Sequence, residues 1–242
     1  MTDPAAGTSP HPADSSSSDY EAPAIYTLWA VFRRDPANPA TLDPAATAAE
    51  LHTALAAAEK SGVTVRGIYD VSGFKAESDL MFWLHGADPA ALQAALRQLR
   101  RTKAIAGLLP EWNYMAVHRA AEFNKHHIPA FVEGKAPKEW TCVYPFIRSH
   151  EWYLLRDGER ARMLKEHGMV GHSYTGVLSN TVAAFALGDY EWVVPLESDE
   201  LVQLTDMMRA LRYVDARLHV TLETPFFTGR RITPDEVAEV LS

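Results

Sequence analysis

Cysteine is nearly absent from this sequence, since Cys142 is the single one among 242 residues. One thiol excludes an internal disulfide. Basic residues are also few, because 23 Lys and Arg stand against 31 Asp and Glu, which gives a formal charge of -8. That balance, without any basic block, disfavours non-specific binding to nucleic acid or to anionic membranes.

Long apolar runs and several catalytic signatures are missing as well. No segment approaches the ~20 apolar residues that a membrane-spanning helix needs. The sequence contains no Gly-rich phosphate-binding loop, no G-x-S-x-G and no H-E-x-x-H motif. Residues 1–22 lack the basic and apolar parts of a signal peptide and consist mostly of Pro, Ser, Asp and Ala, so we expect a disordered tail. These absences predict a globular, cytoplasmic protein.

Regular patterns begin at Ile25 and follow the order strand, helix, strand, strand, helix, strand. Both helices are expected to open at an Asp-Pro pair, with Asp as the N-cap and Pro in the first helical position. The second helix has apolar residues at i, i+3, i+4 and i+7, which predicts one buried face. The expected elements are strands at 25–34, 63–71, 79–85 and up to about 118, and helices opening at Asp43-Pro44 and Asp88-Pro89.

The second half repeats this order. We expect strands at 139–147, 173–178, 182–194 and 217–224, a helix at 150–167 followed by Gly168 as its C-cap residue, a helix capped by Ser198, and a short last helix opened by the capping box 233–236. The order β-α-β-β-α-β is that of the ferredoxin-like unit. We therefore predict an α+β fold in which two ferredoxin-like halves, 23–118 and 138–242, join into one domain of the dimeric-α+β-barrel type. Residues 119–137 would link the halves.

Three histidines are the first candidates for chemistry. His126 and His127 are adjacent, so regular structure cannot point both at one metal, and a solvated loop explains them equally well. His167 ends the predicted helix 150–167, next to Met163 and Leu164 on an apolar face. Its imidazole either interacts with the helix dipole or, as a neutral group in an apolar pocket, serves as an axial haem ligand.

The densest cluster of aromatic residues is 140-WTCVYPFIRSHEW-152. Tyr144, Phe146 and Arg148 share one face of the predicted strand because side chains alternate along it. Trp152 follows within the next helix. Such a row is usually core, but a row that ends in Arg also suits a flat apolar ligand that carries carboxylates.

Several motifs resemble the chlorite-dismutase-like haem proteins, and most closely the actinobacterial coproheme decarboxylase branch of that family. They are YPFIRS (144–149), EWYLL (151–155), EHG (166–168), LGDYEW (187–192) and PFFTGR (225–230), together with residues 68–86 and 122–131. The resemblance extends from about residue 24 to residue 231.

The resemblance implies a homopentamer of double barrels that binds iron coproporphyrin III (coproheme) in the C-terminal half. It implies that hydrogen peroxide drives the oxidative decarboxylation of two propionates to vinyl groups, which gives haem b in the last step of coproporphyrin-dependent haem biosynthesis. The site residues implied by the family are His167 as the proximal iron ligand, Tyr144 as the radical-forming tyrosine, His127 as the distal histidine, Trp152 beside it, and Arg148 and Arg217 as propionate-facing residues.

These roles are chemically reasonable. Peroxide must lose a proton before it reacts with ferric iron, and a histidine with a pKa near neutrality can accept that proton. A phenol can become a neutral radical by releasing its proton, so Tyr144 could abstract hydrogen from a propionate β-carbon. Arg148 could hold a carboxylate by charge-assisted hydrogen bonds.

Three other functions are alternatives to this interpretation. Chlorite dismutases rely on an arginine about thirteen residues after the proximal histidine, where this sequence has Asn180, and no arginine occurs between residues 163 and 208. A dye-decolorising peroxidase would need a G-x-x-D-G motif, which is absent. A haem carrier or sensor would share His167 but has no need of Tyr144 beside Arg148.

Overall fold

The computed structural model describes residues 24–118 and 128–242. The predicted tail at 1–22 and the first part of the predicted linker, with His126 and His127, lie outside the described residues. None of the helices within the described ranges is long and apolar enough to cross a membrane.

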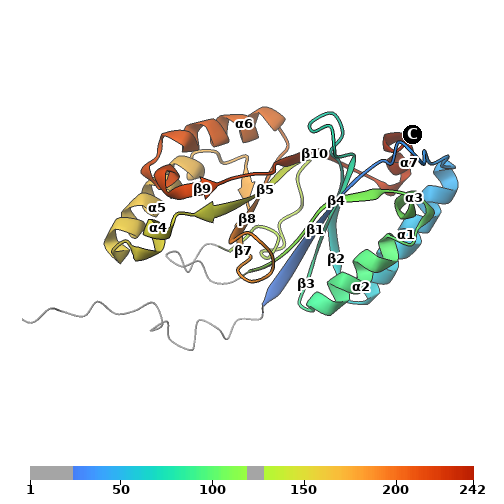
Figure 1. The fold of residues 1–242 in the computed structure, drawn as a ribbon, viewed down its shortest axis with the longest axis horizontal. Helices are drawn as coiled ribbons and strands as arrows, with labels where there is room; N and C mark the ends of the chain where they lie inside the picture. Colours follow the sequence, from blue (N-terminus) through green and yellow to red (C-terminus); the bar gives the residue numbers. More distant parts are fainter. Residues whose placement is uncertain (1–23, 119–127) are drawn as a thin grey trace, which may run out of the picture.

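The first four strands form an antiparallel sheet in the order β4-β1-β3-β2. These strands are β1 (Ile25–Arg33), β2 (Thr64–Asp70), β3 (Leu80–Gly86) and β4 (Leu109–His118). The helices α1 (Pro44–Lys60) and α2 (Pro89–Leu99) cover one face of this sheet, and the short α3 (Lys103–Ala106) follows them (Figure 1). Both predicted N-caps are confirmed, because Asp43 Oδ1 accepts from the Ala46 amide and Asp88 Oδ1 from the Ala90 amide.

The second half contains more and shorter elements. Its strands are β5 (Trp140–Arg148), β6 (Leu178–Ser179), β7 (Val182–Ala183), β8 (Trp192–Ser198), β9 (Val220–Leu222) and β10 (Phe227–Ile232). Its α-helices are α4 (His150–Leu154), α5 (Asp157–His172), α6 (Leu201–Ala210) and α7 (Val237–Val240). Three 3-10 helices complete it: η3 (Leu211–Tyr213), η4 (Asp215–His219) and η5 (Pro234–Glu236).

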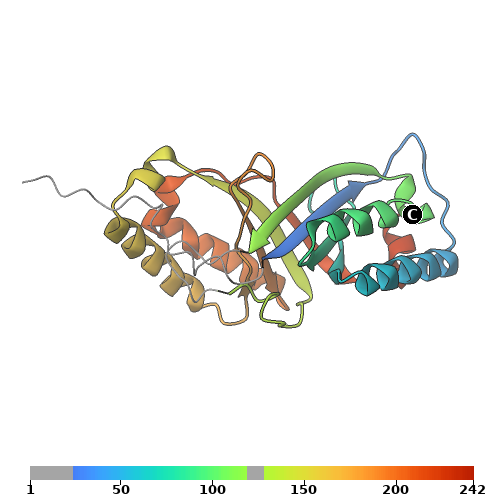
Figure 2. The same cartoon turned by 90° about the horizontal axis from the view of Figure 1, so that it is seen from below.

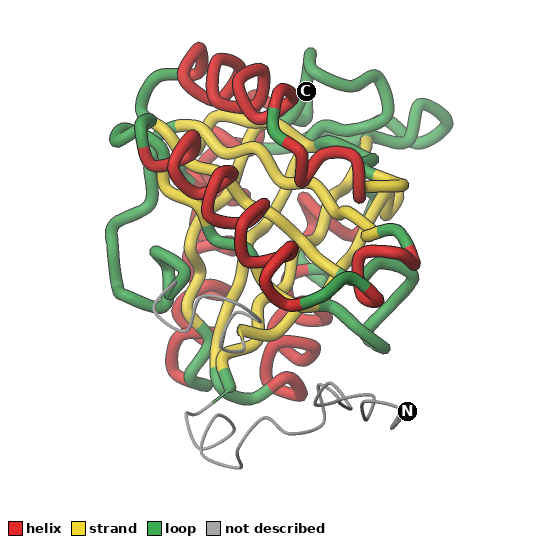
Figure 3. The backbone as a smooth tube through the Cα atoms, turned by 90° about the vertical axis from the view of Figure 1, so that its left-hand side faces the viewer, coloured by secondary structure: helices red, strands yellow, loops and turns green. Residues whose placement is uncertain are grey.

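The strands of both halves join into one closed barrel. β2 pairs with β10, β4 pairs with β7 through Val117 and Ala183, and β5 pairs with β8, which closes the ring. The helices lie on the two outer flanks with the strands between them (Figures 1 and 2). Viewed from the side of the second half, helices cross in front of the strands (Figure 3). The predicted α+β barrel of two ferredoxin-like halves is confirmed.

Three apolar layers hold this arrangement together. Side chains from or next to all eight strands of the closed barrel fill its interior, and Trp29, Trp83 and Phe227 are among the largest. These strands are β1, β2, β3, β4, β5, β7, β8 and β10. The opposite face of the first sheet packs on α1 and α2, where the predicted stripe of Leu92, Ala95, Leu96 and Leu99 is buried. The outer face of the strands β5 and β8 packs on α6, and this third layer includes Tyr144.

The helix predicted over 150–167 is wrong in both its continuity and its end. Leu155 and Arg156 are extended, so the chain forms α4 and then α5. Asp157 and Gly158 have low helix propensity, and Asp157 and Glu159 interact favourably with a new helix N-terminus. At the other end α5 passes through Gly168 to His172, because Val170 packs into the core and extends the helix by one turn.

Several strand predictions in this half are also wrong. The segments 173–178 and 182–194 contain only the short β6 and β7 and the start of β8, which extends to Ser198. Ser198 therefore lies in the strand and is not the cap of α6, although its hydroxyl accepts from the Glu200 amide at 3.1 Å. The predicted strand 217–224 begins as the 3-10 helix η4, and β10 was not predicted. The capping box at Thr233 and Glu236 is confirmed.

Candidate active site

Strand β5 presents its side chains alternately to the barrel interior and to the helices. Val143 points into the barrel, whereas Cys142, Tyr144 and Phe146 lie in the layer between the sheet and α6. Arg148 follows on the same side, since its guanidinium carbon is 5.1 Å from the centre of the Phe146 ring. The aromatic row thus lies against helices and not in the barrel interior.

Tyr144 is buried with its phenol enclosed by two other chain segments. Its ring stacks on Phe226 with centroids 4.6 Å apart, and its hydroxyl donates to the Met208 sulfur at 3.4 Å. Burial and the negative charge of Glu223 raise the pKa of Tyr144 above its usual value. The phenol is therefore protonated near neutral pH and can lose its hydrogen only to a reacting group.

Arg148 is held in place from three sides. Its backbone amide donates to Glu191 Oε2 at 2.9 Å, and its Nη1 donates to the Ala216 carbonyl at 3.0 Å. The guanidinium carbon lies 4.0 Å from the centre of the Trp152 ring, a cation–π contact. This fixed guanidinium can bind a carboxylate with little further loss of side-chain entropy.

Trp152, on α4, is almost completely buried. It packs with Met163 of α5, with Val214, which precedes η4, and with Ala216, which lies on η4. One ring face supports Arg148, and the His219 ring lies 5.5 Å away by centroids. Trp152 thus connects β5, α5 and η4 at the same place.

His167 lies on α5 and is half-buried. Burial and, next in order, the positive charge of Arg148 lower the pKa of His167 from 6.5 to about 4. The imidazole is therefore neutral at physiological pH and keeps a lone pair for a metal ion. That state matches what haem iron requires of an axial histidine.

Arg217 lies on the 3-10 helix η4 and not on the predicted strand. Its Nη2 is 3.4 Å from Glu223 Oε2, and Arg212 Nη1 donates to the same oxygen. The positive charges of both arginines lower the pKa of Tyr144, whereas the negative charge of Glu223 raises it. Arg217 is thus near Tyr144, while Arg148 is near His167.

His127 lies outside the described residues. Asn180, which stands at the position of the chlorite dismutase arginine, lies away from Tyr144 and Arg148. Asn180 is fully buried between β6 and β7, where its Oδ1 accepts from the Phe131 amide and its Nδ2 donates to Glu197 Oε1 at 2.9 Å.

Three residues at the site were not identified from the sequence as functional: Met208, Glu191 and Glu223. Met208 is one of several apolar residues of α6 that pack against this layer, and the sequence alone does not distinguish it from them. Glu191 lies within the LGDYEW motif, and it accepts from both the Arg148 amide and the Tyr153 hydroxyl. Glu223 carries no local signal, because its role depends on arginines that the chain brings to it.

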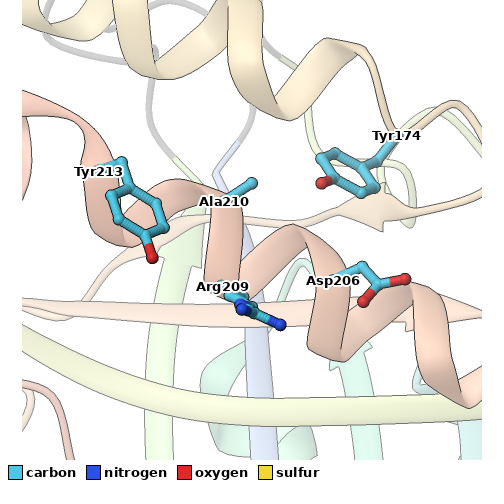
Figure 4. Close-up of a pocket in the computed structure, with 5 residues that line it drawn as sticks. All are labelled: Tyr174, Asp206, Arg209, Ala210 and Tyr213. Atoms are coloured by element: carbon cyan, nitrogen blue, oxygen red, sulfur yellow. The ribbon is translucent and has the colours of Figure 1, made fainter.

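A separate hollow of about 330 Å³ lies between Tyr174 and the outer side of α6. Asp206, Arg209, Ala210 and Tyr213 complete its lining (Figure 4). It includes none of the residues predicted for catalysis, and its polar, open form does not suit a porphyrin.

Comparisons with known proteins identify the family of this chain. The family model described as chlorite dismutase matches residues 45–232. The chain is 49% identical over 213 residues to a coproheme decarboxylase of Mycolicibacterium smegmatis, an alignment that covers 88% of this chain and 92% of that protein.

Solved structures show the same fold at lower identity. A putative chlorite dismutase has a TM-score of 0.76 at 20% identity, with 90% of this chain and 100% of that chain covered. The chlorite dismutase of Candidatus Nitrospira defluvii in complex with imidazole has a TM-score of 0.76 at 19% identity, with 90% and 94% covered. Because the family model spans most of the sequence and a curated relative is 49% identical over 213 residues, this chain belongs to the chlorite dismutase family.

Proposed function

We propose that this protein is a coproheme decarboxylase, which uses hydrogen peroxide to convert two propionates of iron coproporphyrin III into vinyl groups and so yields haem b. The observation that carries the proposal is the buried, protonated Tyr144 on the same strand face as the fixed Arg148, near a neutral His167. A carrier would need the histidine but not the phenol. The 49% identity to a protein of that name supports the same activity.

The residues fit a porphyrin that carries carboxylates. His167 would hold the iron through its neutral imidazole. Arg148 and Arg217 would bind propionates, and Trp152 would support Arg148 and pack beside the porphyrin edge. Tyr144 and Arg148 are four positions apart, a span of about 13 Å at roughly 3.3 Å per residue. That span approaches the width of a porphyrin with its side chains, so the two groups would address different edges.

The electron count sets what the site must achieve. Each propionate that becomes a vinyl group loses CO₂, one proton and two electrons, and one hydrogen peroxide takes up two electrons and two protons to give two waters. Bound iron coproporphyrin would supply the redox chemistry with peroxide. His127, assigned by resemblance, would accept the proton of the incoming peroxide, and Tyr144 would take hydrogen from the propionate β-carbon.

Chlorite chemistry is not supported. Asn180 stands where the family's chlorite-degrading members are expected to have arginine, and its amide is bonded to Phe131, Pro195 and Glu197. By resemblance we also expect a homopentamer and a cytoplasmic location.

Mass spectrometry of the porphyrin tests the proposal. Purified protein is loaded with iron coproporphyrin III and titrated with peroxide, and the wild type should lose two CO₂ units. The variant Tyr144→Phe keeps the ring on Phe226 and removes only a hydrogen bond to sulfur, which is a weak acceptor. It should bind the porphyrin normally and yield no vinyl product.

An unchanged porphyrin in the wild type would support a carrier or sensor instead. Loss of both CO₂ units by the phenylalanine variant at the wild-type rate would remove Tyr144 from the mechanism and return the aromatic row to a packing role.

A further inference from the structure

Two guanidinium groups converge on one carboxylate beside Tyr144. Arg212 Nη1 donates to Glu223 Oε2, and Arg217 Nη2 lies 3.4 Å from the same oxygen. The Glu223 side chain is only 14% exposed, whereas those of Arg212 and Arg217 are 39% and 36% exposed. The three side chains carry a formal charge of +1, and the two cations are the more accessible members.

The chain segments that carry this cluster also enclose the phenol of Tyr144. Arg212 follows four residues after Met208, whose sulfur accepts from the Tyr144 hydroxyl. Glu223 precedes Phe226 by three residues, and the Phe226 ring stacks on Tyr144. The charges of all three cluster members also affect the pKa of Tyr144. The cluster therefore lies in the neighbourhood of the Tyr144 phenol, on the segments that enclose it.

The chemistry of Glu223 suggests what the arginines bind. A glutamate side chain consists of two methylenes and a carboxylate, which is the same group as a porphyrin propionate. Each guanidinium has five N–H donors in a planar fork that matches a carboxylate. The cluster's excess positive charge favours a second carboxylate over any neutral group.

We propose that Arg212 and Arg217 form the binding subsite for the propionate that reacts beside Tyr144, and that Glu223 occupies this subsite as an internal carboxylate until the substrate replaces it. The inference rests on the proposed function, since it takes a porphyrin with four propionates as the substrate. It makes Arg212 and Glu223 specificity-determining residues of the site. Glu223 orients the two guanidiniums before binding and competes with the substrate for them.

The test measures binding of metal-free coproporphyrin III to the full-length protein by quenching of porphyrin fluorescence. This readout needs neither iron nor turnover. Arg212→Gln should weaken binding by about tenfold or more, since a hydrogen bond to a charged group contributes about 1.5–3 kcal/mol. Glu223→Gln should tighten binding by about two- to fivefold, the range expected when a partly exposed ion pair of about 0.5–1 kcal/mol no longer competes.

Arg209→Gln is the matched control. It removes the same charge from α6, three residues away, but Arg209 lines the separate hollow beside Tyr174. Its affinity for coproporphyrin should equal that of the wild type. The gain from Glu223→Gln should be smaller when it is introduced into Arg212→Gln than into the wild type, because Glu223 in that background competes with the substrate for Arg217 alone.

Binding of protoporphyrin IX, measured in the same way, shows which propionates the subsite holds. This porphyrin has vinyl groups at the two positions that react in coproporphyrin III and keeps the other two propionates. Its affinity should change much less than that of coproporphyrin III in Arg212→Gln. Equal losses for both porphyrins would overturn the assignment to the reacting propionate.

Other outcomes separate the inference from the proposed function. If the wild type binds and decarboxylates coproheme but Arg212→Gln and Glu223→Gln behave like Arg209→Gln, only the subsite is wrong. If the wild type binds no coproporphyrin, both proposals fail. Improved binding in Glu223→Gln cannot arise from misfolding, so this variant tests the inference even if Arg212→Gln folds poorly.

Discussion

A buried ion pair inside the barrel allows a quantitative prediction about stability. Glu197 is fully buried, and its Oε1 accepts from Arg66 Nε at 3.0 Å and from Arg66 Nη2 at 2.7 Å. The same oxygen accepts from Asn180, and Oε2 accepts from the Lys138 amide at 3.3 Å. Glu197→Gln removes the charge but keeps the shape, so it leaves the Arg66 guanidinium buried without a counter-charge.

The expected cost is about 3–5 kcal/mol, the usual result of removing one partner from a buried pair. For a chain of this size, that corresponds to a fall in the melting temperature of about 6–20 °C. Replacing both partners, as in Arg66→Met/Glu197→Met, should restore most of the stability, since no unpaired charge remains. Urea unfolding at one fixed protomer concentration measures these differences, because stability depends on concentration if the protein is an oligomer.

A cost below about 1 kcal/mol for Glu197→Gln would refute this reasoning, because values that small are typical of pairs exposed to water. So would a double variant that is less stable than the single one. The first result would mean that water reaches the pair within the barrel.

Three further predictions concern histidines. His167→Ala should weaken binding of iron coproporphyrin and change its ferric absorption spectrum, and unchanged bands would mean that another residue binds the iron. His127→Ala should slow the reaction with peroxide by about 10²–10⁴-fold at nearly constant porphyrin affinity, in line with general-base catalysis. Burial, and then the charge of Arg66, lower the pKa of His85 from 6.5 to about 4 in the folded state, where its ring lies against Phe131. Because only the unfolded state binds the proton between those values, stability should fall as the pH drops from about 6.5 to 4. His85→Leu should make the urea-midpoint profile less steep over that range, and His167, whose pKa is lowered in the same way, should maintain part of the slope.

Local signals in the sequence were sufficient wherever one residue determines an element. Asp43 and Asp88 cap their helices, and Gly62, with a positive φ of 78°, follows the end of the first helix. The repeat of element order predicted the barrel, because two ferredoxin-like sheets have open edges that can pair with each other. The four strands of the first half were all predicted from the apolar patterns along the chain.

The second half was harder to predict because tertiary contacts override its local patterns. β10 is a single short strand that pairs with β5 on one side and β2 on the other, so its pairing depends on residues more than 80 positions away. The segment around Arg217 has an apolar, β-branched pattern, yet it begins as η4, where Ala216 packs on Trp152 and its carbonyl binds Arg148. For the same reason, the spacing of residues in the sequence does not predict that Arg217, paired with Glu223, lies near Tyr144.

The charge at the candidate site shows why composition alone limits such conclusions. The chain has a formal charge of -8, which disfavours non-specific binding of anions. At physiological salt, however, charges are screened beyond about 8 Å, so a bound carboxylate interacts mainly with its near neighbours. Those neighbours include Arg148 near His167, and Arg212 and Arg217 near Tyr144. A porphyrin with four propionates would therefore meet locally positive groups on a protein that is negative overall, and that contrast would favour a polyanion of the right shape over anions in general.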